Sequence, residues 1–155
     1  MDSIDYHILQ CLRENARMGA SSMSKRVNLS VSAVLERIRK MEQSGLICGY
    51  TVLTDIKAHG VGLIALIEVR LEHPKYYEAF SQMVAETPEI VSCFYTTGDY
   101  DFLMQVYAGD ADDLERLHRK IKSVGGVGQT RTNVVLKRLK DEPVYFCPQP
   151  DAERK

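Results

Sequence analysis

The spacing of apolar and polar positions over residues 1–45 predicts three short helices. In the segment 2–14, apolar side chains recur at intervals of three and four, which is the period of a helix with one buried face. Asp2 is expected to cap this helix, because its carboxylate can accept a hydrogen bond from an otherwise unpaired backbone N–H. Asp5 lies in the first turn, where a negative charge suits the positive end of the helix dipole.

The other two helices flank a short turn, Asn28-Leu29-Ser30. Asn28 tolerates left-handed backbone angles, and Ser30 can cap the helix that follows. The helix before the turn is expected to begin at an N-cap formed by Ser21 or Ser22. This order of elements is typical of a helix-turn-helix.

The helix after the turn is expected to run from residue 31 to about residue 44. Gly45 is expected to end it as a left-handed cap, with Leu46 packing back on Met41. Its buried stripe is predicted to consist of Val34, Leu35, Ile38 and Met41. The opposite face carries Ser32, Ala33, Glu36, Arg37, Arg39 and Lys40.

A helix-turn-helix can place its second helix in the DNA major groove. The alternative is an ordinary helical hairpin with a solvated, charged face. Between residues 21 and 45 there are five basic and two acidic side chains, a balance of +3, whereas the whole chain carries −1. A basic patch on a nearly neutral chain favours phosphate contact through a limited surface.

Contacts to double-stranded DNA are expected from the turn and the two helices around it. Arg37 and Lys40 are the expected phosphate or guanine contacts, although Arg37 could instead pair with an acid of its own domain. The residues predicted to face DNA are Lys25, Ser30, Ser32, Ala33, Glu36, Arg37 and Lys40.

The pattern changes beyond residue 61, where strands and helices alternate. The expected elements are a strand over 62–72, a helix opened by Pro74, strands over 90–97 and 101–107 around Gly98-Asp99, a helix after Gly109-Asp110, and a strand over 127–139. This βαββαβ order predicts a ferredoxin-like α+β unit with both helices on one sheet face. The other face keeps Ile64 and Leu66, so it needs a second copy or a ligand to cover it.

The chain is therefore expected to contain a DNA-binding domain over 1–54, a hinge over 55–61, an effector and dimerisation domain over 62–140, and a tail over 141–155. The segment 46–54 is rich in β-branched residues and is either a short wing strand or the start of the linker. Residues 1–60 carry +2 and residues 61–155 carry −3. This charge asymmetry supports an N-terminal domain, the head, that binds DNA and a C-terminal domain, the body, that senses an effector or forms oligomers. Within the tail, a short docked strand is expected at Val144, Tyr145 and Phe146.

Other classes of protein find little support in the composition. No apolar run approaches the roughly 20 residues of a membrane span. The opening MDSID has neither the basic nor the apolar region of a signal peptide. Four cysteines without a C-x-x-C pair are expected to be reduced core thiols in a cytosolic protein. The four histidines show no metal-ligand spacing, so no metal and no cofactor are expected.

Up to about Lys140, the sequence resembles the Lrp/AsnC, or feast/famine, transcription regulators. The residues that carry the resemblance are Ile4-Asp5, Ile8-Leu9, Leu12, Arg17, Leu29-Ser30, Leu35-Glu36-Arg37-Ile38, Met41-Glu42, Gly45-Leu46-Ile47, Gly49-Tyr50, Gly98-Asp99-Tyr100-Asp101 and Thr130-Arg131-Thr132. The resemblance implies a winged helix-turn-helix joined by a hinge to an effector-binding domain. It also implies a cytoplasmic, nucleoid-associated homodimer that pairs through its sheets and assembles into tetramers or octamers.

The resemblance further implies that a free amino acid binds near the Gly98 hairpin, at a contact between dimers. An amino-acid zwitterion needs an acceptor for its ammonium, which Asp101 or Asp99 can supply, and donors for its carboxylate. Backbone N–H groups of the hairpin and two threonine hydroxyls on one strand face can be these donors. The expected site comprises Gly98, Asp99, Tyr100, Asp101, Thr130 and Thr132. Without an effector, the same residues would form a plain hairpin turn and a polar strand face.

The family pattern is broken at two places. Met23-Ser24 stands where the family often has Leu-Ala, and Ser32 stands where it often has proline, which leaves Ser32 able to contact a base edge. The leading hypothesis is a sequence-specific regulator that responds to an amino acid, and the alternative is an architectural DNA-binding protein without an effector. An enzyme would use Asp99 and Asp101 as an acid/base pair, but no nucleophile, metal set or cofactor loop accompanies them.

Overall fold

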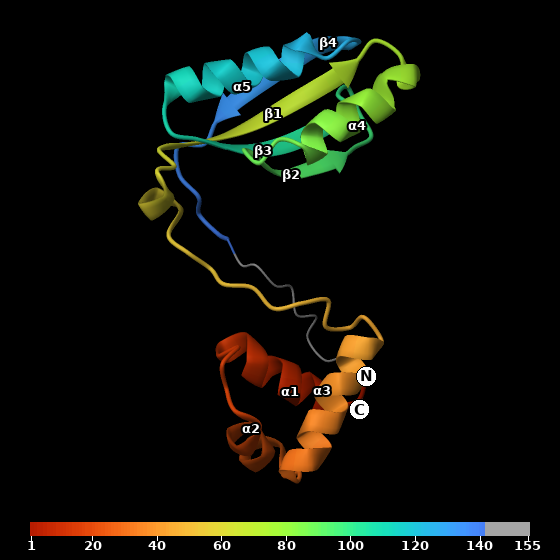
Figure 1. Ribbon diagram of the computed structural model, residues 1–155, viewed down its shortest axis with the longest axis vertical. Helices are drawn as coiled ribbons and strands as arrows, with labels where there is room; N and C mark the ends of the chain where they lie inside the picture. The colour runs from red at the N-terminus through yellow and green to blue at the C-terminus, as the bar shows by residue number, and fades with distance from the viewer. Residues whose placement is uncertain (142–155) are drawn as a thin grey trace, which may run out of the picture. The chain divides into compact units, whose positions relative to one another are not determined.

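The computed structural model describes residues 1–141, in which two compact units are resolved, Met1–Leu53 and Thr54–Lys140 (Figure 1). Each unit has a hydrophobic core of its own. Within the described residues, no helix has the length and apolar character needed to cross a membrane. The strand predicted at 144–146 lies outside the described residues.

Three helices form the first unit, as the sequence predicts. They are α1 (Ser3–Glu14), α2 (Ala20–Val27) and α3 (Val31–Gln43). Their buried core consists of Ile8, Cys11, Met23, Val34 and Met41. Helices this short are marginal in isolation, so their shared apolar core is what stabilises them.

The predicted cap of α1 is confirmed. The Asp2 carboxylate accepts a hydrogen bond from the Asp5 backbone N–H at 2.8 Å, and the Asp5 carboxylate accepts one from the Asp2 N–H at 3.0 Å. This reciprocal pair is a capping box, which satisfies two backbone donors that the helix itself leaves unpaired.

The predicted serine cap of α2 is wrong. The helix begins one residue earlier, at Ala20, and Gly19 takes the extended cap position. The Gly19 carbonyl already accepts from the N–H groups of Ser22 and Met23, so both candidate serines lie inside the first turn. Alanine has the highest helix propensity, which explains why the helix extends back to it.

The turn between α2 and α3 is formed as predicted. Asn28 adopts left-handed angles, φ 54° and ψ 44°, and the Ser30 hydroxyl accepts from the Ala33 N–H at 3.2 Å. At the far end of α3, Gly45 has φ 74°, which confirms the left-handed cap. The two cap residues therefore set where α3 starts and where the chain leaves it.

Two predicted core positions around α3 are wrong. Leu46 is 46% exposed, and Ile47 instead packs on the core while its N–H donates to the Met41 carbonyl at 3.1 Å. Leu35 is 49% exposed, because it lies about 100° around the helix from the fully buried Val34. No strand follows α3 over residues 46–54, so the linker alternative holds in the single chain.

The second unit is a four-stranded antiparallel sheet in the order β2-β3-β1-β4. Its strands are β1 (Leu63–Leu71), β2 (Ile90–Tyr95), β3 (Phe102–Ala108) and β4 (Val127–Val134). Its helices are α4 (Tyr77–Ala85) and α5 (Ala111–Ser123), with short 3₁₀ turns at Ile56–His59 and Pro74–Tyr76. The βαββαβ order and the ferredoxin-like α+β fold are thus confirmed.

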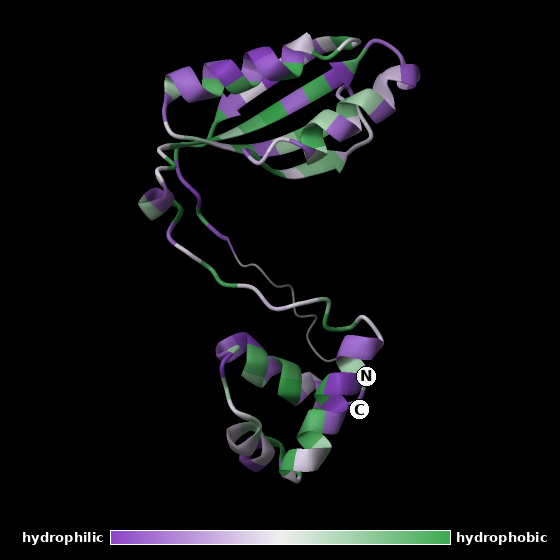
Figure 2. Cartoon of the chain, in the orientation of Figure 1, coloured by the Kyte–Doolittle hydropathy of each residue, from purple (hydrophilic) through white to green (hydrophobic). Residues whose placement is uncertain are grey.

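Alternate residues of β1 separate the two faces of the sheet. Ala65, Ile67 and Val69 are buried against α4 and α5. Figure 2 shows that α5 is largely hydrophilic, with apolar residues recurring along it. Ile64 and Leu66 point to the other face, which we call the open face.

The fourth strand is shorter than predicted. It ends at Val134 instead of residue 139, and a last hydrogen bond joins the Val135 N–H to the Ile64 carbonyl at 2.8 Å. Its neighbour β1 begins at Leu63, so residues further along have no strand left to pair with. The length of the partner strand, and not the composition of β4, decides this boundary.

Two adjacent glycines before β4 allow a matched test of this fold. Gly126 has φ +85°, and a Cβ there would lie 2.0 Å from a Tyr76 ring carbon, whereas a Cβ on Gly125 would meet nothing within 4 Å. We expect Gly126→Ala to lower the free energy of unfolding by about 2 kcal/mol or more, through strain and clash. Gly125→Ala should stay within about 0.5 kcal/mol of the wild type. Urea unfolding followed by circular dichroism measures both, and equal losses would contradict the assigned backbone.

Candidate functional site

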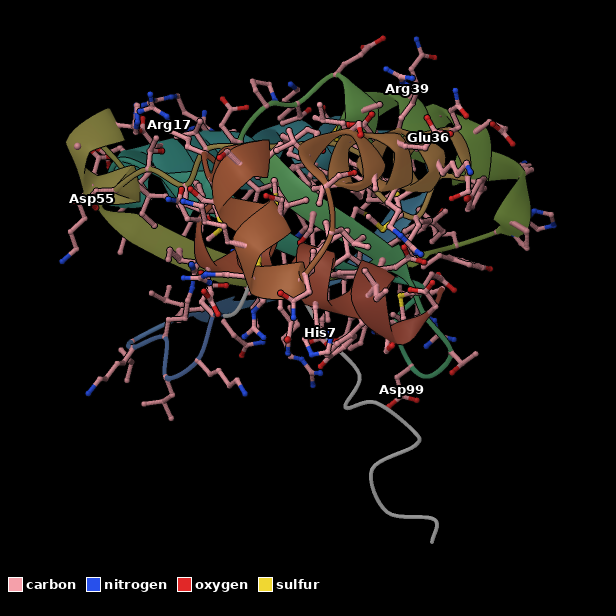
Figure 3. All side chains as sticks on the ribbon, turned by 90° about the horizontal axis from the view of Figure 1, so that it is seen from below. His7, Arg17, Glu36, Arg39, Asp55 and Asp99 are labelled. Carbon is pink, nitrogen blue, oxygen red and sulfur yellow. The ribbon has the colours of Figure 1, made fainter. Side chains whose placement is uncertain are left out.

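The exposed side of α2 and α3 carries most of the residues predicted to face DNA. Lys25, Ser30, Ser32, Glu36 and Lys40 are exposed, whereas Ala33 and Arg37 are half-buried. Along α3, Ser32, Glu36 and Lys40 are four residues apart and so form one row. Glu36 lies 3.4 Å from the Lys40 ammonium and 3.7 Å from the Arg39 guanidinium, both as exposed pairs, and Figure 3 labels Glu36 and Arg39 on this helix. Such exposed pairs are weak, so the basic groups can exchange partners.

Arg37 is held inside its own unit. Its Nη1 donates to carboxylate oxygens of Asp2 and Asp5, each at 2.7 Å, and its side chain is only 30% exposed. The alternative expected from the sequence, pairing with an acid of the same domain, is what the structure shows. Arg37 therefore ties α3 to the start of α1.

The contact between Arg37 and Asp2 also shifts the pKa values of these two groups. The pKa of Asp2 lies below its usual value, first because the Asp5 backbone N–H donates to it and then because Arg37 does. The hydrogen bonds to Asp2 and Asp5 raise the pKa of Arg37. The charged forms of both partners are therefore favoured in the folded unit.

Sequence reasoning missed one feature of the α3 surface. Val31 and Leu35, four residues apart on the same side of the helix, are 42% and 49% exposed. Neither belongs to the core of the first unit. No separate signal in the sequence marks Leu35, because a helical stripe about 100° wide can include either neighbour of Val34.

The predicted effector hairpin joins β2 to β3. Gly98 has φ 133°, an angle that favours glycine, and Asp99 is exposed at the tip, where Figure 3 shows its side chain pointing away from the body. The Thr96 N–H donates to the Asp101 carbonyl at 2.8 Å and the Thr96 hydroxyl donates to the Tyr100 carbonyl at 3.0 Å. These bonds close the loop without using the Asp99 carboxylate.

Asp101 attaches this loop to the sheet. Its Oδ2 accepts from the Leu71 N–H at 2.7 Å, and its own N–H donates to the Val69 carbonyl at 3.0 Å. The side chain is half-buried. One carboxylate oxygen of Asp101 is thus occupied in holding the hairpin against the end of β1.

Tyr100 lies on the open face beside an ion pair. The Arg131 guanidinium is 4.9 Å from the centre of the Tyr100 ring, and its Nη2 donates to Glu68 at 2.7 Å. Because of this partner, the pKa of Glu68 lies below its usual value. The cation–π contact fixes one side of the predicted effector loop.

The two predicted threonines lie on the opposite side of β4. Thr130 and Thr132 share a face, as predicted, but they pair with Val69 and Ile67, so this is the face that the helices cover. The Thr130 hydroxyl lies 3.0 Å from Nε2 of His118 on α5. Within one chain, the four predicted residues from Gly98 to Asp101 lie together in the hairpin loop. Thr130 and Thr132 lie instead on the face of the sheet that the helices cover.

A hollow of about 540 Å³ in the second unit lies at the other end of β3. Its lining includes Val61, Ala108 and Leu117, and none of the six predicted effector residues. The described residues contain no cluster of three or more potential metal ligands. Cys11 is buried, but Cys48 is exposed, so the expectation that the cysteines are core thiols is wrong there. Cys147 lies outside the described residues.

Two protein-family models match this chain. The AsnC-type helix-turn-helix domain matches residues 1–42, and the Lrp/AsnC ligand binding domain matches residues 64–145. The first match lies within the unit Met1–Leu53, and the second covers most of the unit Thr54–Lys140.

Relatives with similar sequences are named as regulators. The HTH-type transcriptional regulator FL11 of Pyrococcus horikoshii is 36% identical over 141 residues, which are 91% of this chain and 93% of that protein. The leucine-responsive regulatory protein of Escherichia coli K12 is 34% identical over 143 residues, 90% of this chain and 87% of that protein. A transcriptional regulator of Neisseria meningitidis, solved as a complex with L-Met, has a TM-score of 0.87 at 32% identity and covers 92% of this chain and 94% of its own.

The capping box predicts a specific pH dependence. Asp2→Asn keeps a capping side chain but removes the charge that Arg37 contacts. Because the folded-state pKa of Asp2 is lowered from 3.8, its contribution is present above about pH 4 and is lost as the pH falls through the folded value. We expect the variant to melt below the wild type at pH 7, with the difference shrinking below pH 4. Asp55→Asn, on a 3₁₀ cap, is the control, and a difference that grows in acid would contradict the assignment.

Proposed function

Because this chain belongs to the Lrp/AsnC family of transcriptional regulators, we propose that it binds specific DNA sequences through α2 and α3 and that a free amino acid modulates this binding. Members of the family are regulators and not enzymes. The observation that carries the proposal is the α2-turn-α3 surface, where exposed lysine and serine side chains accompany a capped helix.

On this surface, the basic side chains contact phosphate and the residues near the start of α3 contact bases. Lys25 and Lys40 are exposed and can neutralise phosphates, and Ser30 and Ser32 can donate to phosphate oxygens or base edges. Arg37 contributes indirectly, because its ion pairs with Asp2 and Asp5 hold α3 in position. Ala33 and Glu36 complete the proposed DNA-facing set.

The effector site centres on the hairpin from Gly98 to Asp101. The Neisseria regulator with a similar fold was solved with L-Met, which supports an amino acid as the ligand class. Asp99 is exposed, and the Oδ1 of Asp101 is the carboxylate oxygen not used by Leu71, so either can accept from an ammonium group. We infer that another copy completes the site and contributes Thr130 and Thr132, because Asp99 is exposed in one chain and the two threonines of that chain lie on another face of the sheet.

A homodimer is proposed to form through the open face. Across this face, Phe94 pairs with Leu103, Leu103 with Glu68, and Glu68 with Arg131. Phe94 is 58% exposed, and Ile64 and Leu66 lie on the same face. Covering these apolar side chains with the same face of a second copy is favourable, and further pairing of dimers would give the tetramers or octamers that the family resemblance implies.

DNA binding by this surface should weaken steeply with salt. Each phosphate contact releases counterions, so the slope of log affinity against log salt should fall by about one when Lys40→Ala removes a contact. The control is Lys122→Ala on α5 of the second unit, whose slope should equal that of the wild type. Fluorescence anisotropy with a labelled duplex from upstream of the chain's own gene measures both. An affinity unchanged between about 50 and 200 mM salt would rule out phosphate contact.

An amino-acid effector should stabilise the folded protein. A ligand at about a hundred times its dissociation constant adds roughly 2.7 kcal/mol, so a thermal-shift panel of the common amino acids should show one or a few positive responses. At least one of the two variants Asp99→Asn and Asp101→Asn should remove the response. Asn at position 101 can still accept from the Leu71 N–H, so the hairpin stays attached.

Glu89→Gln, at the other end of the sheet, is the control for this panel and should respond like the wild type. A flat panel with a folded protein would contradict the effector and favour an architectural DNA-binding protein. A response that survives in both aspartate variants would move the site away from the hairpin.

A further inference from the structure

An exposed apolar row runs along the first half of α3. Val31 and Leu35 are separated by four residues, and Arg39 follows four residues later in the same row. Both apolar side chains are more than two-fifths exposed. The core of the first unit is formed without them, through Val34, Met41 and their neighbours, so core packing does not explain their exposure.

The start of α3 also lacks charge. Residues 31–35 contain no charged side chain, and the first one along the helix is Glu36. Arginine and lysine recognise guanine through paired hydrogen bonds, but Arg37 is bound to Asp2 and Asp5, and Arg39 lies two turns into the helix. The N-terminal end of a recognition helix is the part that reaches base edges, so neither arginine is placed to make paired hydrogen bonds to guanine there.

The side chains at the start of α3 are therefore apolar or carry a hydroxyl group. In the major groove, the one apolar group that a base pair presents is the C5-methyl of thymine. The exposed basic side chains of α2 and α3 include Lys25, Arg39 and Lys40, and they suit a polyanion as the occupant of this surface. An apolar protein partner would not use these positive charges.

We propose that Val31 and Leu35 determine sequence specificity by contacting thymine methyl groups in the major groove. This assignment rests on the proposed DNA binding and adds the chemical group that is recognised. It predicts that the preferred site contains A·T pairs at defined positions and that part of the preference comes from the methyl group alone.

Replacing thymine by deoxyuridine tests this directly, because it removes only the methyl group. A preferred duplex is first selected from a random pool with the full chain, and each thymine is then replaced in turn. Losing one buried methyl contact should weaken binding about fourfold at one or more positions, measured by fluorescence anisotropy. For Val31→Ala or Leu35→Ala, replacing the thymine that the missing side chain contacts should weaken binding less than twofold.

Lys40→Ala is the matched control: it should bind all duplexes more weakly but keep the same thymine-to-uracil ratio. Both apolar positions are exposed, so circular dichroism of Val31→Ala and Leu35→Ala should match the wild type. The assignment is overturned if no uracil weakens wild-type binding, if both alanine variants keep the wild-type ratio, or if the pool does not converge. It is also overturned if Leu35→Ala changes only the oligomeric state in light scattering, since a second copy would then occupy the row. Failure to bind any duplex overturns the proposed function itself.

Discussion

The central strand β1 can bury only one of its two faces within a single chain. Its buried residues, Ala65, Ile67 and Val69, pack beneath the two helices, and the strand pairs on both edges with β3 and β4. Among the described residues, the second unit supplies no third layer for the other side of the sheet. The open face, with its apolar and charged side chains, is therefore the feature that makes association with another molecule favourable for this fold.

The hairpin and the open face are mechanically connected. Asp101 holds the hairpin to the end of β1, while the Tyr100 ring rests on Arg131, which in turn binds Glu68 on β1. A ligand that moves this loop therefore acts on side chains of the face that is proposed to pair with a second copy. Such a chain of contacts provides a physical route by which binding of a small molecule can alter assembly.

Much of the fold can be predicted from the sequence because the ends of the helices are set by the chemistry of single residues. Asp2, Asn28, Ser30 and Gly45 each have a backbone role that their own chemistry determines, and all four are confirmed. Alternation along β1 likewise identifies its buried side.

The wrong predictions concern features of the fold that depend on tertiary contacts and not on local sequence. A helical stripe about 100° wide can include either neighbour of Val34, and only the position of the other helices shows that Leu35 is outside. The end of β4 depends on where β1 begins, and the face of Thr130 depends on the register with Val69. The effector site is harder still, since a site shared between copies leaves only part of its geometry in one chain.

The segment between α3 and the turn at Ile56–His59 has a consequence for DNA geometry. Residues 48–55 have no regular secondary structure. Eight extended residues span at most about 29 Å, so each head is tethered within a limited volume around its body. In the proposed homodimer, the second DNA-binding unit would meet DNA at a high effective concentration, and the weak contacts of the two units would combine into avidity. The tether length thus limits the distance between half-sites that one dimer can bridge, while its lack of regular structure allows that distance to vary.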